Sequence, residues 1–431
     1  MEETKENIER AVTVGIDWPG AEWPVESSLE ELSRLIDTAG ATVVASTTQR
    51  LSAPNARTLV GSGKAEEIAE LCRTYSADMV VFDDELTPSQ QSNLEKIVGR
   101  DVKVFDRTAL ILDIFALHAT TREGRLQVRL AQNQYLYPRL RGMWAHLASN
   151  RMGGGVGSRF GEGESQLEVD RRMVRNRISS IKRELARIDK IRTVQREGRY
   201  KSPTFKIALA GYTNAGKSSL INRLTGSDVL SYDKLFATLD ATTRKLRLPE
   251  GRVVTITDTI GFIRKLPTTL VESFKSTLDE INGADLILHV IDCSSEEAAY
   301  QIQTVEDVLG QIGAERIERL TVFNKVDLMA GSNRIEHLKK NHPTALFVSA
   351  ETGEGIETLV ERISRVAAAQ GTYCDVVVPY NRGDIVALAH TRCHIVSETH
   401  EETGTHLRLY APSDCAHIFV ELAKTAKHDE A

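Results

Sequence analysis

The chain has 431 residues, of which 41% are hydrophobic and 26% charged, and a formal net charge of −6. This length exceeds what one hydrophobic core fills and indicates roughly two to four domains. No apolar run approaches the length of a membrane span, and the acidic start Met1-Glu2-Glu3-Thr4-Lys5-Glu6 is unlike a secretory signal. Five scattered cysteines without metal-ligand spacing favour reduced thiols. We therefore expect a cytoplasmic protein without a membrane span.

The net charge conceals an asymmetry along the chain. Residues 122–200 carry 18 Lys and Arg against 8 Asp and Glu, so this block is at +10 and the remainder at −16. Arginine outnumbers lysine 16 to 2 in the block. The arginine guanidinium can donate two hydrogen bonds to one phosphate and can stack on a base. A block this basic in an acidic protein favours a nucleic-acid-facing element. The alternative is a solvated helical surface with unpaired arginines.

Residues 1–106 alternate short apolar strands with amphipathic helices, which predicts a small parallel α/β domain. The expected strands are 12–16, 41–45, 59–61, 79–82 and 102–105, and the expected helices are 28–39, 64–75 and one that begins at Thr87-Pro88. Gly61-Ser62-Gly63-Lys64 resembles a phosphate-binding loop, but Thr58 stands where the first glycine of such a loop belongs. We interpret the segment as the turn that opens a helix.

Residues 107–200 predict a long antiparallel helical hairpin. Apolar residues recur from 109 to about 137, and again from 167 onward at steps of three and four, so two helices can bury these stripes against each other. The stretch 153–163 between them has six glycines and cannot hold a helix. Basic and aromatic residues favour an RNA-binding hairpin over a bare linker: Arg151, Arg159 and Phe160 at the tip, then Arg171, Arg172, Arg175 and Arg177 on the returning helix. The alternative is that these arginines pair with Glu168 and Asp170.

A complete phosphate-binding loop follows the strand-like run 205–210. Its residues are Gly211-Tyr212-Thr213-Asn214-Ala215-Gly216-Lys217-Ser218, and a helix-compatible segment comes next. A turn between strand and helix points backbone N–H groups at phosphates, and the helix N-terminus adds positive potential. Lys217 can reach the β- and γ-phosphates, and the Ser218 hydroxyl can hold Mg²⁺. We conclude that the chain binds a nucleoside triphosphate.

Three further segments, each at the end of a predicted strand, identify the nucleotide. They are Asp258-Thr259-Ile260-Gly261, then Asn324-Lys325-Val326-Asp327, and finally Val348-Ser349-Ala350 with Glu351. Asp258 can hold magnesium through water, and the Gly261 N–H can contact the γ-phosphate. Asp327 can accept two hydrogen bonds from N1–H and the 2-amino group of guanine, which adenine cannot offer. Segments at successive carboxyl ends match the place where open α/β sheets bind ligands, so we expect GTP.

The rest of residues 201–370 completes a P-loop GTPase domain with a mixed sheet flanked by helices. Its candidate for the first switch segment is Leu235-Phe236-Ala237-Thr238-Leu239-Asp240-Ala241-Thr242-Thr243-Arg244. A threonine there can coordinate Mg²⁺ and sense the γ-phosphate, and Thr238, Thr242 and Thr243 are all chemically suitable. Residues 371–431 predict a small α+β domain with strands 374–378, 393–398 and 405–410 and helices 384–390 and 414–424.

Taken together, these segments resemble the HflX family of ribosome-associated GTPases over essentially the whole chain. Besides the phosphate-binding loop, the marks are Leu235-Phe236-Ala237-Thr238-Leu239-Asp240, Asp258-Thr259-Ile260-Gly261-Phe262-Ile263, Gln127-Val128-Arg129-Leu130-Ala131-Gln132 and Gly163-Glu164-Ser165-Gln166-Leu167-Glu168-Val169-Asp170-Arg171-Arg172. The GTPase marks alone would admit relatives such as Era or Obg. The segment Val60-Gly61-Ser62-Gly63-Lys64 and the arginine-rich hairpin favour HflX. The family pattern implies that Thr238 is the magnesium-sensing threonine, so that Lys217, Thr238 and Gly261 carry the catalysis.

The resemblance implies a monomeric factor that binds the 50S subunit, splits or rescues stalled 70S ribosomes with GTP and leaves after hydrolysis. The hairpin would contact 23S rRNA near the peptidyl-transferase region. The family tip usually reads Arg-Gly-Pro-Gly-Glu, whereas Phe160-Gly161-Glu162-Gly163-Glu164 stands here. Acidic Glu162 in place of proline would weaken or redirect the contact with RNA phosphate.

One position bears on the chemistry of hydrolysis. Many GTPases place a glutamine after the glycine of the second switch to orient the attacking water. Phe262 stands there, so we expect slow turnover until another group is supplied. Two other functions fit the residues: an RNA-remodelling or assembly protein with GTP as a latch, and a tRNA-modification GTPase, which the lack of a cysteine-bearing catalytic C-terminus disfavours.

Overall fold

The chain forms two compact units in a computed structural model that describes residues 8–21, 23–99, 101–150, 160–200, 204–226, 235–236, 239, 241–265, 267, 270, 273–329, 331–369, 371–411 and 415–428. The first unit comprises residues 1–187 together with 232–240 and 265–275. The second comprises 188–231, 241–264 and 276–431. Two short stretches of the predicted GTPase domain therefore belong to the same unit as the N-terminal domain.

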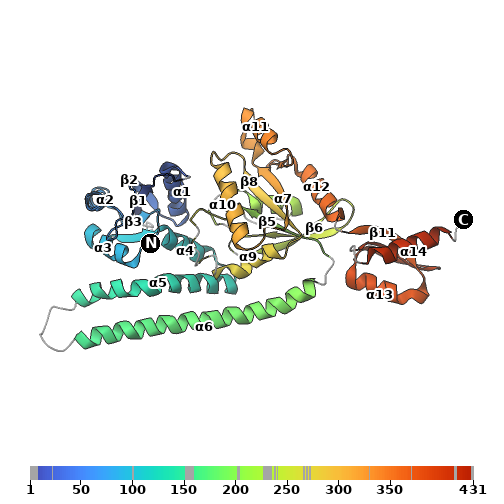
Figure 1. The fold of residues 1–431 in the computed structure, drawn as a ribbon, viewed down its shortest axis with the longest axis horizontal. Helices are drawn as coiled ribbons and strands as arrows, with labels where there is room; N and C mark the ends of the chain where they lie inside the picture. The colour runs from blue at the N-terminus through green and yellow to red at the C-terminus, as the bar shows by residue number, and fades with distance from the viewer. Residues whose placement is uncertain are drawn as a thin grey trace, which may run out of the picture. The chain divides into compact units, whose positions relative to one another are not determined.

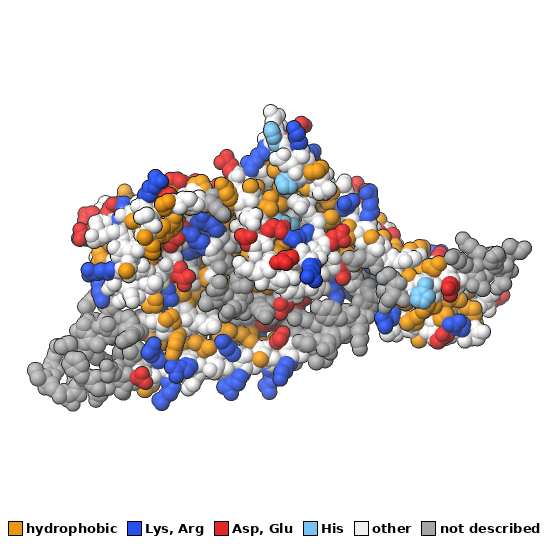
Figure 2. Space-filling model, viewed as in Figure 1, with side chains coloured by type: hydrophobic (Ala, Val, Ile, Leu, Met, Phe, Trp, Pro, Cys, Tyr) orange, Lys and Arg blue, Asp and Glu red, His pale blue; other side chains and the backbone are white. Residues whose placement is uncertain are grey.

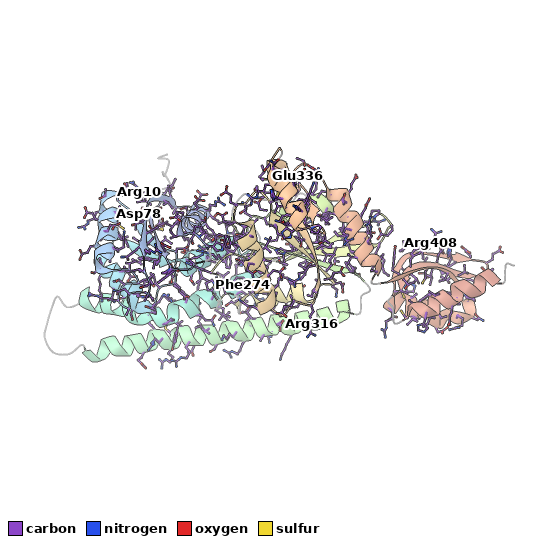
Figure 3. All side chains as sticks on the ribbon, turned by 45° about the horizontal axis from the view of Figure 1, so that its top comes forward. Arg10, Asp78, Phe274, Arg316, Glu336 and Arg408 are labelled. Atoms are coloured by element: carbon purple, nitrogen blue, oxygen red, sulfur yellow. The ribbon has the colours of Figure 1, made fainter. Side chains whose placement is uncertain are left out.

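The first unit begins with a four-stranded parallel sheet of strand order β2-β1-β3-β4 (Figure 1). Its elements are β1 (Arg10–Asp17), α1 (Val25–Thr38), β2 (Thr42–Arg50), α2 (Ser62–Thr74), β3 (Met79–Phe82), α3 (Pro88–Val98) and β4 (Lys103–Asp106). β3 is buried along its whole length, as expected for a parallel strand covered on both faces. Arg10 and Asp78, labelled in Figure 3, join the starts of β1 and β3, because Arg10 N–H donates to Asp78 Oδ2 at 2.8 Å.

Three helices follow the N-terminal sheet. They are α4 (Arg107–His118), α5 (Arg122–Asn150) and α6 (Phe160–Tyr200), whose residues up to 187 belong to the first unit. α5 and α6 run side by side in opposite directions (Figures 1 and 3). Arg122 Nε donates to Glu184 at 3.1 Å, and Arg175 Nη2 donates to the Tyr137 hydroxyl at 2.7 Å. The antiparallel hairpin that the apolar periodicity predicts is therefore confirmed.

The second unit holds a six-stranded mixed sheet of order β10-β9-β8-β5-β7-β6, in which only β6 is antiparallel to its neighbour. Its elements are β5 (Lys206–Gly211), α7 (Lys217–Thr225), β6 (Thr242–Arg247), β7 (Val253–Asp258), α9 (Lys275–Asn282), β8 (Leu286–Asp292), α10 (Ala298–Gln311), β9 (Glu318–Asn324), the 3₁₀ turn η1 (Val326–Met329), α11 (Asn333–Asn341), β10 (Leu346–Phe347) and α12 (Ile356–Ala369). Inward-facing side chains of β5, β7, β8 and β9 form one core with α7 and α12.

An antiparallel sheet of order β11-β13-β12 ends the chain. Its elements are β11 (Thr372–Val378), η2 (Tyr380–Arg382), α13 (Gly383–Arg392), β12 (His394–Glu401), β13 (Gly404–Ala411) and α14 (Ala416–His428). Arg252 and Val253 connect this sheet to β7: the Arg252 guanidinium lies 4.8 Å from the Tyr410 ring centre, and the Val253 N–H donates to His394 Nε2 at 3.2 Å. The predicted α+β C-terminal fold is confirmed. Within the described part of the chain, no helix is both long and apolar enough to span a membrane.

Three local expectations were wrong and one was right. The helix expected from 109 to about 137 is broken between His118 and Arg122, because Ala119 is extended and the Thr121 hydroxyl accepts the Gly124 N–H as a new helix start. The strand expected at 59–61 is a tight loop, since Leu59 has φ +66° and pairs only with Asn55. The turn at Gly61 does open α2.

The glycine-rich stretch is the third wrong expectation. α6 begins at Phe160, so Gly161 and Gly163 lie within a helix that the glycine count had excluded there. Residues 151–159 lie outside the described residues, and with them Arg151, Gly153 and Arg159.

A buried ion-pair cluster fixes α1 and α4 at the end of the N-terminal sheet. Arg107, the first residue of α4, donates to Asp83 Oδ1 at 2.8 Å and also pairs with Glu31 of α1. Burial raises the pKa of Asp83, but Arg107 and Lys265 more than offset it and lower this pKa to about 2, against 3.8 for the ordinary group. Ionised Asp83 therefore stabilises the fold above pH about 4, and this contribution is lost as the pH falls towards 2.

We expect Arg107→Met to lower the free energy of unfolding by about 3–5 kcal/mol, because it leaves the buried Asp83 and the partly buried Glu31 without their shared cation. Urea denaturation measures this loss, and in an acid titration the variant should lose less stability as the pH falls, since its Asp83 is less acidic. Arg73→Met is the matched control: its side chain is 70% exposed and pairs with Glu70 on the surface. Equal destabilisation by the two changes would contradict the role given to the buried cluster.

Candidate active site

The phosphate-binding loop joins β5 to α7 with a backbone that few residues besides glycine can follow. A Cβ on Gly211 would lie 2.3 Å from the Val290 carbonyl oxygen, and one on Gly216 would lie 2.2 Å from Asn324 Nδ2. Gly216, with φ +86°, is the N-cap of α7, and Asn214 also has a left-handed backbone, with φ +61°. The predicted loop therefore has the strand-turn-helix geometry that phosphate binding needs.

Lys217 points back over the loop from the first turn of α7. Its side chain is buried, and its Nζ donates to the carbonyl oxygens of Gly211 at 3.1 Å and Tyr212 at 2.9 Å. Burial lowers the pKa of Lys217 to about 8, although the Asp258 carboxylate opposes the shift. A phosphate group in the loop would exchange these two neutral acceptors for a charged one and favour the ammonium form.

Ser218 and Asp258 meet beside this lysine. The Ser218 hydroxyl donates to Asp258 Oδ2 at 2.6 Å, and Asp258 is buried at the end of β7. The next residue, Thr259, donates its hydroxyl to the Leu209 carbonyl of β5 and is fully buried. The sequence alone placed Ser218 and Asp258 at one magnesium site, and the structure brings their oxygen atoms together.

The segment after Asp258 is hydrogen-bonded to the phosphate-binding loop. The Phe262 N–H donates to the Gly211 carbonyl at 3.1 Å, and the Phe262 carbonyl accepts the Thr213 N–H at 2.7 Å. The Arg264 N–H donates to the Tyr212 hydroxyl at 2.9 Å. The Phe262 side chain is fully buried, so its position after the glycine holds a core residue and no water-orienting group.

Asn324 connects the phosphate end of the site to the base end. It is buried at the end of β9, its Nδ2 donates to the Ala215 carbonyl at 2.9 Å, and its Oδ1 accepts the Ala350 N–H at 3.0 Å. Ser349 is fully buried, and its hydroxyl accepts the Thr352 N–H at 3.0 Å, which shapes the loop beside Ala350. Glu351 is exposed in that loop. Three of the four predicted segments thus converge on one side chain.

Lys325 lies along the phosphate-binding loop rather than away from it. Its Cε is 4.0 Å from the position a Cβ would take on Gly216, and its Nζ pairs with Asp292 Oδ2 at 2.8 Å. The sequence patterns did not identify Asp292. The available signal was an acidic residue at the end of the buried strand β8, beside the strand that delivers Lys325. Asp327 follows, half-buried in η1.

The first switch candidate is described only in part. Leu235, Phe236 and Leu239 are buried, while Ala237, Thr238 and Asp240 lie outside the described residues. The assignment of Thr238 to magnesium stays a prediction, as do the nucleotide-binding roles of the other site residues.

A phosphate-binding loop, an Asp-x-x-Gly segment and an Asn-Lys-x-Asp turn at the carboxyl edge of one mixed sheet define a P-loop GTPase. Three family models match the chain in succession: "GTP-binding GTPase N-terminal" over residues 26–116, "GTP-binding GTPase Middle Region" over 118–199 and "50S ribosome-binding GTPase" over 206–325. The chain belongs to the HflX family of GTPases, and its enzymatic activity is the hydrolysis of GTP. The resemblance expected from the sequence is confirmed.

Curated relatives support this assignment over nearly the whole chain. The GTPase HflX of Caldanaerobacter subterraneus subsp. tengcongensis is 44% identical over 412 residues, which cover 95% of this chain and 92% of the relative. The GTPase HflX of Escherichia coli K12 is 41% identical over 378 residues, which cover 88% of each. Among solved structures, a GTP-binding protein from Sulfolobus solfataricus in complex with GDP is 23% identical, with a TM-score of 0.44 over 84% of this chain and 99% of that one.

We expect Asp327→Asn to shift the base preference from guanine towards xanthine nucleotides. The carboxylate can accept two hydrogen bonds from guanine, whereas the asparagine amide can donate one to the 2-oxo group of xanthine. Competition between labelled GDP and unlabelled XDP or ADP measures the preference. Wild-type protein that bound ADP as tightly as GDP would show that Asp327 does not face the base.

Proposed function

We propose that this GTPase binds the 50S subunit, uses GTP to split or rescue stalled 70S ribosomes, and leaves when GTP is hydrolysed. The observation that carries the proposal is the combination, in one chain, of a GTPase domain matched by a "50S ribosome-binding GTPase" model with a basic helical hairpin. The partners would be 50S and 70S particles, with 23S rRNA against the hairpin. The protein would act as a monomer in the cytoplasm.

The basic surface is formed by exposed Lys and Arg side chains of α6, and Figure 2 shows them along the outer edge of the hairpin. The exposed Lys and Arg residues of α6 include Arg172, Arg175, Arg177, Lys182, Arg183 and Arg187. On the same helix, Ile181 is buried. A row of exposed cations along one helix can bind RNA phosphate by shape and charge.

Two of the four arginines singled out in the sequence also have a role within the hairpin. Arg175 donates to the Tyr137 hydroxyl, and the guanidinium groups of Arg171 and Arg175 lie 5.5 and 5.8 Å from the Tyr137 ring centre. Arg172 and Arg177 are exposed on the same helix. This difference supplies a matched pair of variants for testing RNA contact separately from hairpin stability.

The donor set near Lys217 suits Mg²⁺ bound with GTP, because Mg²⁺ prefers hydroxyl and carboxylate oxygens together with phosphate. Ser218 would coordinate the ion directly, Asp258 through water, and Thr238 from the first switch segment. The ion would supply charge stabilisation on the β- and γ-phosphates. Lys217 and the Gly261 N–H would hold the γ-phosphate, while Phe262 leaves the attacking water without an orienting group.

We expect slow GTP turnover by the chain alone and stimulation by 50S or 70S particles, roughly 10²–10⁵-fold if the ribosome supplies one well-placed group. Phosphate release measured with and without purified particles tests this. Lys217→Ala should abolish turnover in both conditions while the fold remains. Fast turnover by the isolated protein would contradict the proposal that the ribosome completes the site.

Co-sedimentation with ribosomes in the presence of a non-hydrolysable GTP analogue tests the function itself. Conversion of 70S particles into free subunits supports splitting. Binding to 50S without splitting would support the RNA-remodelling or assembly function instead. Binding to tRNA without ribosome binding would point to a tRNA-modification GTPase.

Arg172→Ala combined with Arg177→Ala should weaken 50S binding and make it less dependent on salt. A plot of the logarithm of the binding constant against the logarithm of the salt concentration has a negative slope. This slope should become less steep by about 0.7–0.9 for each phosphate that the variant no longer neutralises. GDP affinity of the free protein should not change, since the phosphate-binding loop does not involve α6. Arg171→Ala combined with Arg175→Ala is the comparison pair, which removes the interactions with Tyr137 and should lower thermal stability more. An unchanged salt slope in both double variants would show that the basic surface does not meet RNA.

A further inference from the structure

The loop that follows β10 forms the base end of the site. It runs from Ser349 to Gly355, and α12 begins at the next residue. The Ser349 N–H donates to the Glu354 carbonyl at 2.9 Å, and the Ser349 carbonyl accepts the Gly353 N–H at 2.9 Å. Gly355 packs tightly against β10, because a Cβ on it would overlap the Phe347 carbonyl oxygen. The loop therefore follows one compact path between the strand and the helix.

Asn324 holds only the first part of this loop. Its Oδ1 accepts the Ala350 N–H at 3.0 Å, and the Ser349 hydroxyl accepts the Thr352 N–H at 3.0 Å. Neither hydrogen bond involves the Thr352 carbonyl or Gly353. That far side of the loop is held by another element.

An arginine of α7 contacts the far side. Arg223 Nη2 donates to the Thr352 carbonyl at 2.7 Å. Gly353 has φ +91°, and a Cβ on it would overlap the Arg223 guanidinium, whose Cζ and Nε lie 3.0 Å from that position. The guanidinium thus fills the space that a side chain at position 353 would take. Arg223 is exposed, yet it meets the loop both through a hydrogen bond and through close packing.

The helix that carries Arg223 also carries the phosphate-binding lysine. α7 begins at Lys217, and Arg223 lies six residues later, about 9 Å further along the helix axis. Between them, Leu220 and Ile221 are buried in the core that α7 shares with α12. One packed helix therefore meets the phosphate-binding loop at its first turn and the base loop at its last turn.

The chemistry of guanine gives the base loop a specific task. Guanine has its O6 acceptor next to N1–H, so a base whose N1–H donates to Asp327 presents O6 to the donor alongside. The donors that the loop offers are the backbone N–H groups of Ala350 and Glu351. A donor discriminates against a base without O6 when its position is fixed, because an unmatched polar group is then left unpaired.

We propose that Arg223 is a positioning residue for guanine recognition: by holding Thr352 and Gly353, it fixes the backbone N–H groups that donate to O6. It acts through the loop and not on the nucleotide. Arg223 and the loop both lie in the second unit. The role rests on the proposed base site at Asp327 and Ala350, and it does not depend on ribosome binding.

Arg223→Met tests the proposal, because it removes the donor and the planar group but keeps a long side chain. We expect affinity for GDP and inosine diphosphate, which both have O6, to fall roughly 2–10-fold, the range for one hydrogen bond. The 5′-diphosphate of 2-aminopurine riboside keeps the 2-amino group but has no O6, so its affinity should not change. A merely structural loss would weaken all three nucleotides alike. Competition against fluorescent GDP gives the three constants.

Three further variants sharpen this test. Arg223→Lys keeps a donor and should recover part of the GDP affinity. Gly353→Ala places a methyl group where the guanidinium lies, and its effect combined with Arg223→Met should be less than additive, because both changes disturb one contact. Arg365→Met is the matched control and should change none of the affinities, since Arg365 of α12 is 72% exposed and pairs with Glu361 on the same helix.

Two results would overturn the proposal while the base site stands. They are unchanged GDP affinity in Arg223→Met, and equal weakening of GDP and the 2-aminopurine nucleotide. Wild-type protein that bound GDP no better than the 2-aminopurine nucleotide would contradict the base site itself, and the role of Arg223 with it.

Discussion

The site depends on one buried amide, that of Asn324. Its nitrogen donates to the phosphate-binding loop, and its oxygen accepts from the loop that follows β10, so the phosphate and base ends of the site are set by the same side chain. A buried polar group of this kind is costly unless both of its ends are satisfied, and here both are. The close approach of Gly216 to Asn324 follows from this contact, because any Cβ there would occupy the amide's place.

A second constraint acts from the N-terminal sheet. Arg107 pairs with Asp83 and Glu31, and Asp83 in turn receives Ser28 and Lys265. The cluster joins α1, β3 and α4 to a segment of the GTPase sequence. Because Arg107 is almost fully buried, it compensates the carboxylates at low dielectric and leaves Asp83 ionised and able to hold a lysine. The sheet thus holds the ionised Asp83 carboxylate in a fixed, buried position.

Local sequence patterns predict those parts of the site whose residues are close together in the sequence. The loop from Gly211 to Ser218 and the turn at Asn324 follow from fixed spacings, and the hairpin from apolar periodicity. The lysine contact could not be predicted, since Lys265 and Asp83 are 182 positions apart and neither belongs to a motif. The break after His118 was missed because a threonine hydroxyl, rather than glycine or proline, restarts the helix. Residues 59–61 were predicted as a strand because Leu59 and Val60 are apolar, whereas the backbone of Leu59 is left-handed.

The segment that follows Gly261 is held at both of its ends. Phe262 has both backbone groups bonded to the phosphate-binding loop and its ring in the core, so it cannot turn to present a polar group to water. Three residues later, the Lys265 ammonium pairs with Asp83 and Asp84. The short segment from Phe262 to Lys265 is therefore bonded at both of its ends. Phe262 therefore cannot orient an attacking water, and a group that does so must come from elsewhere.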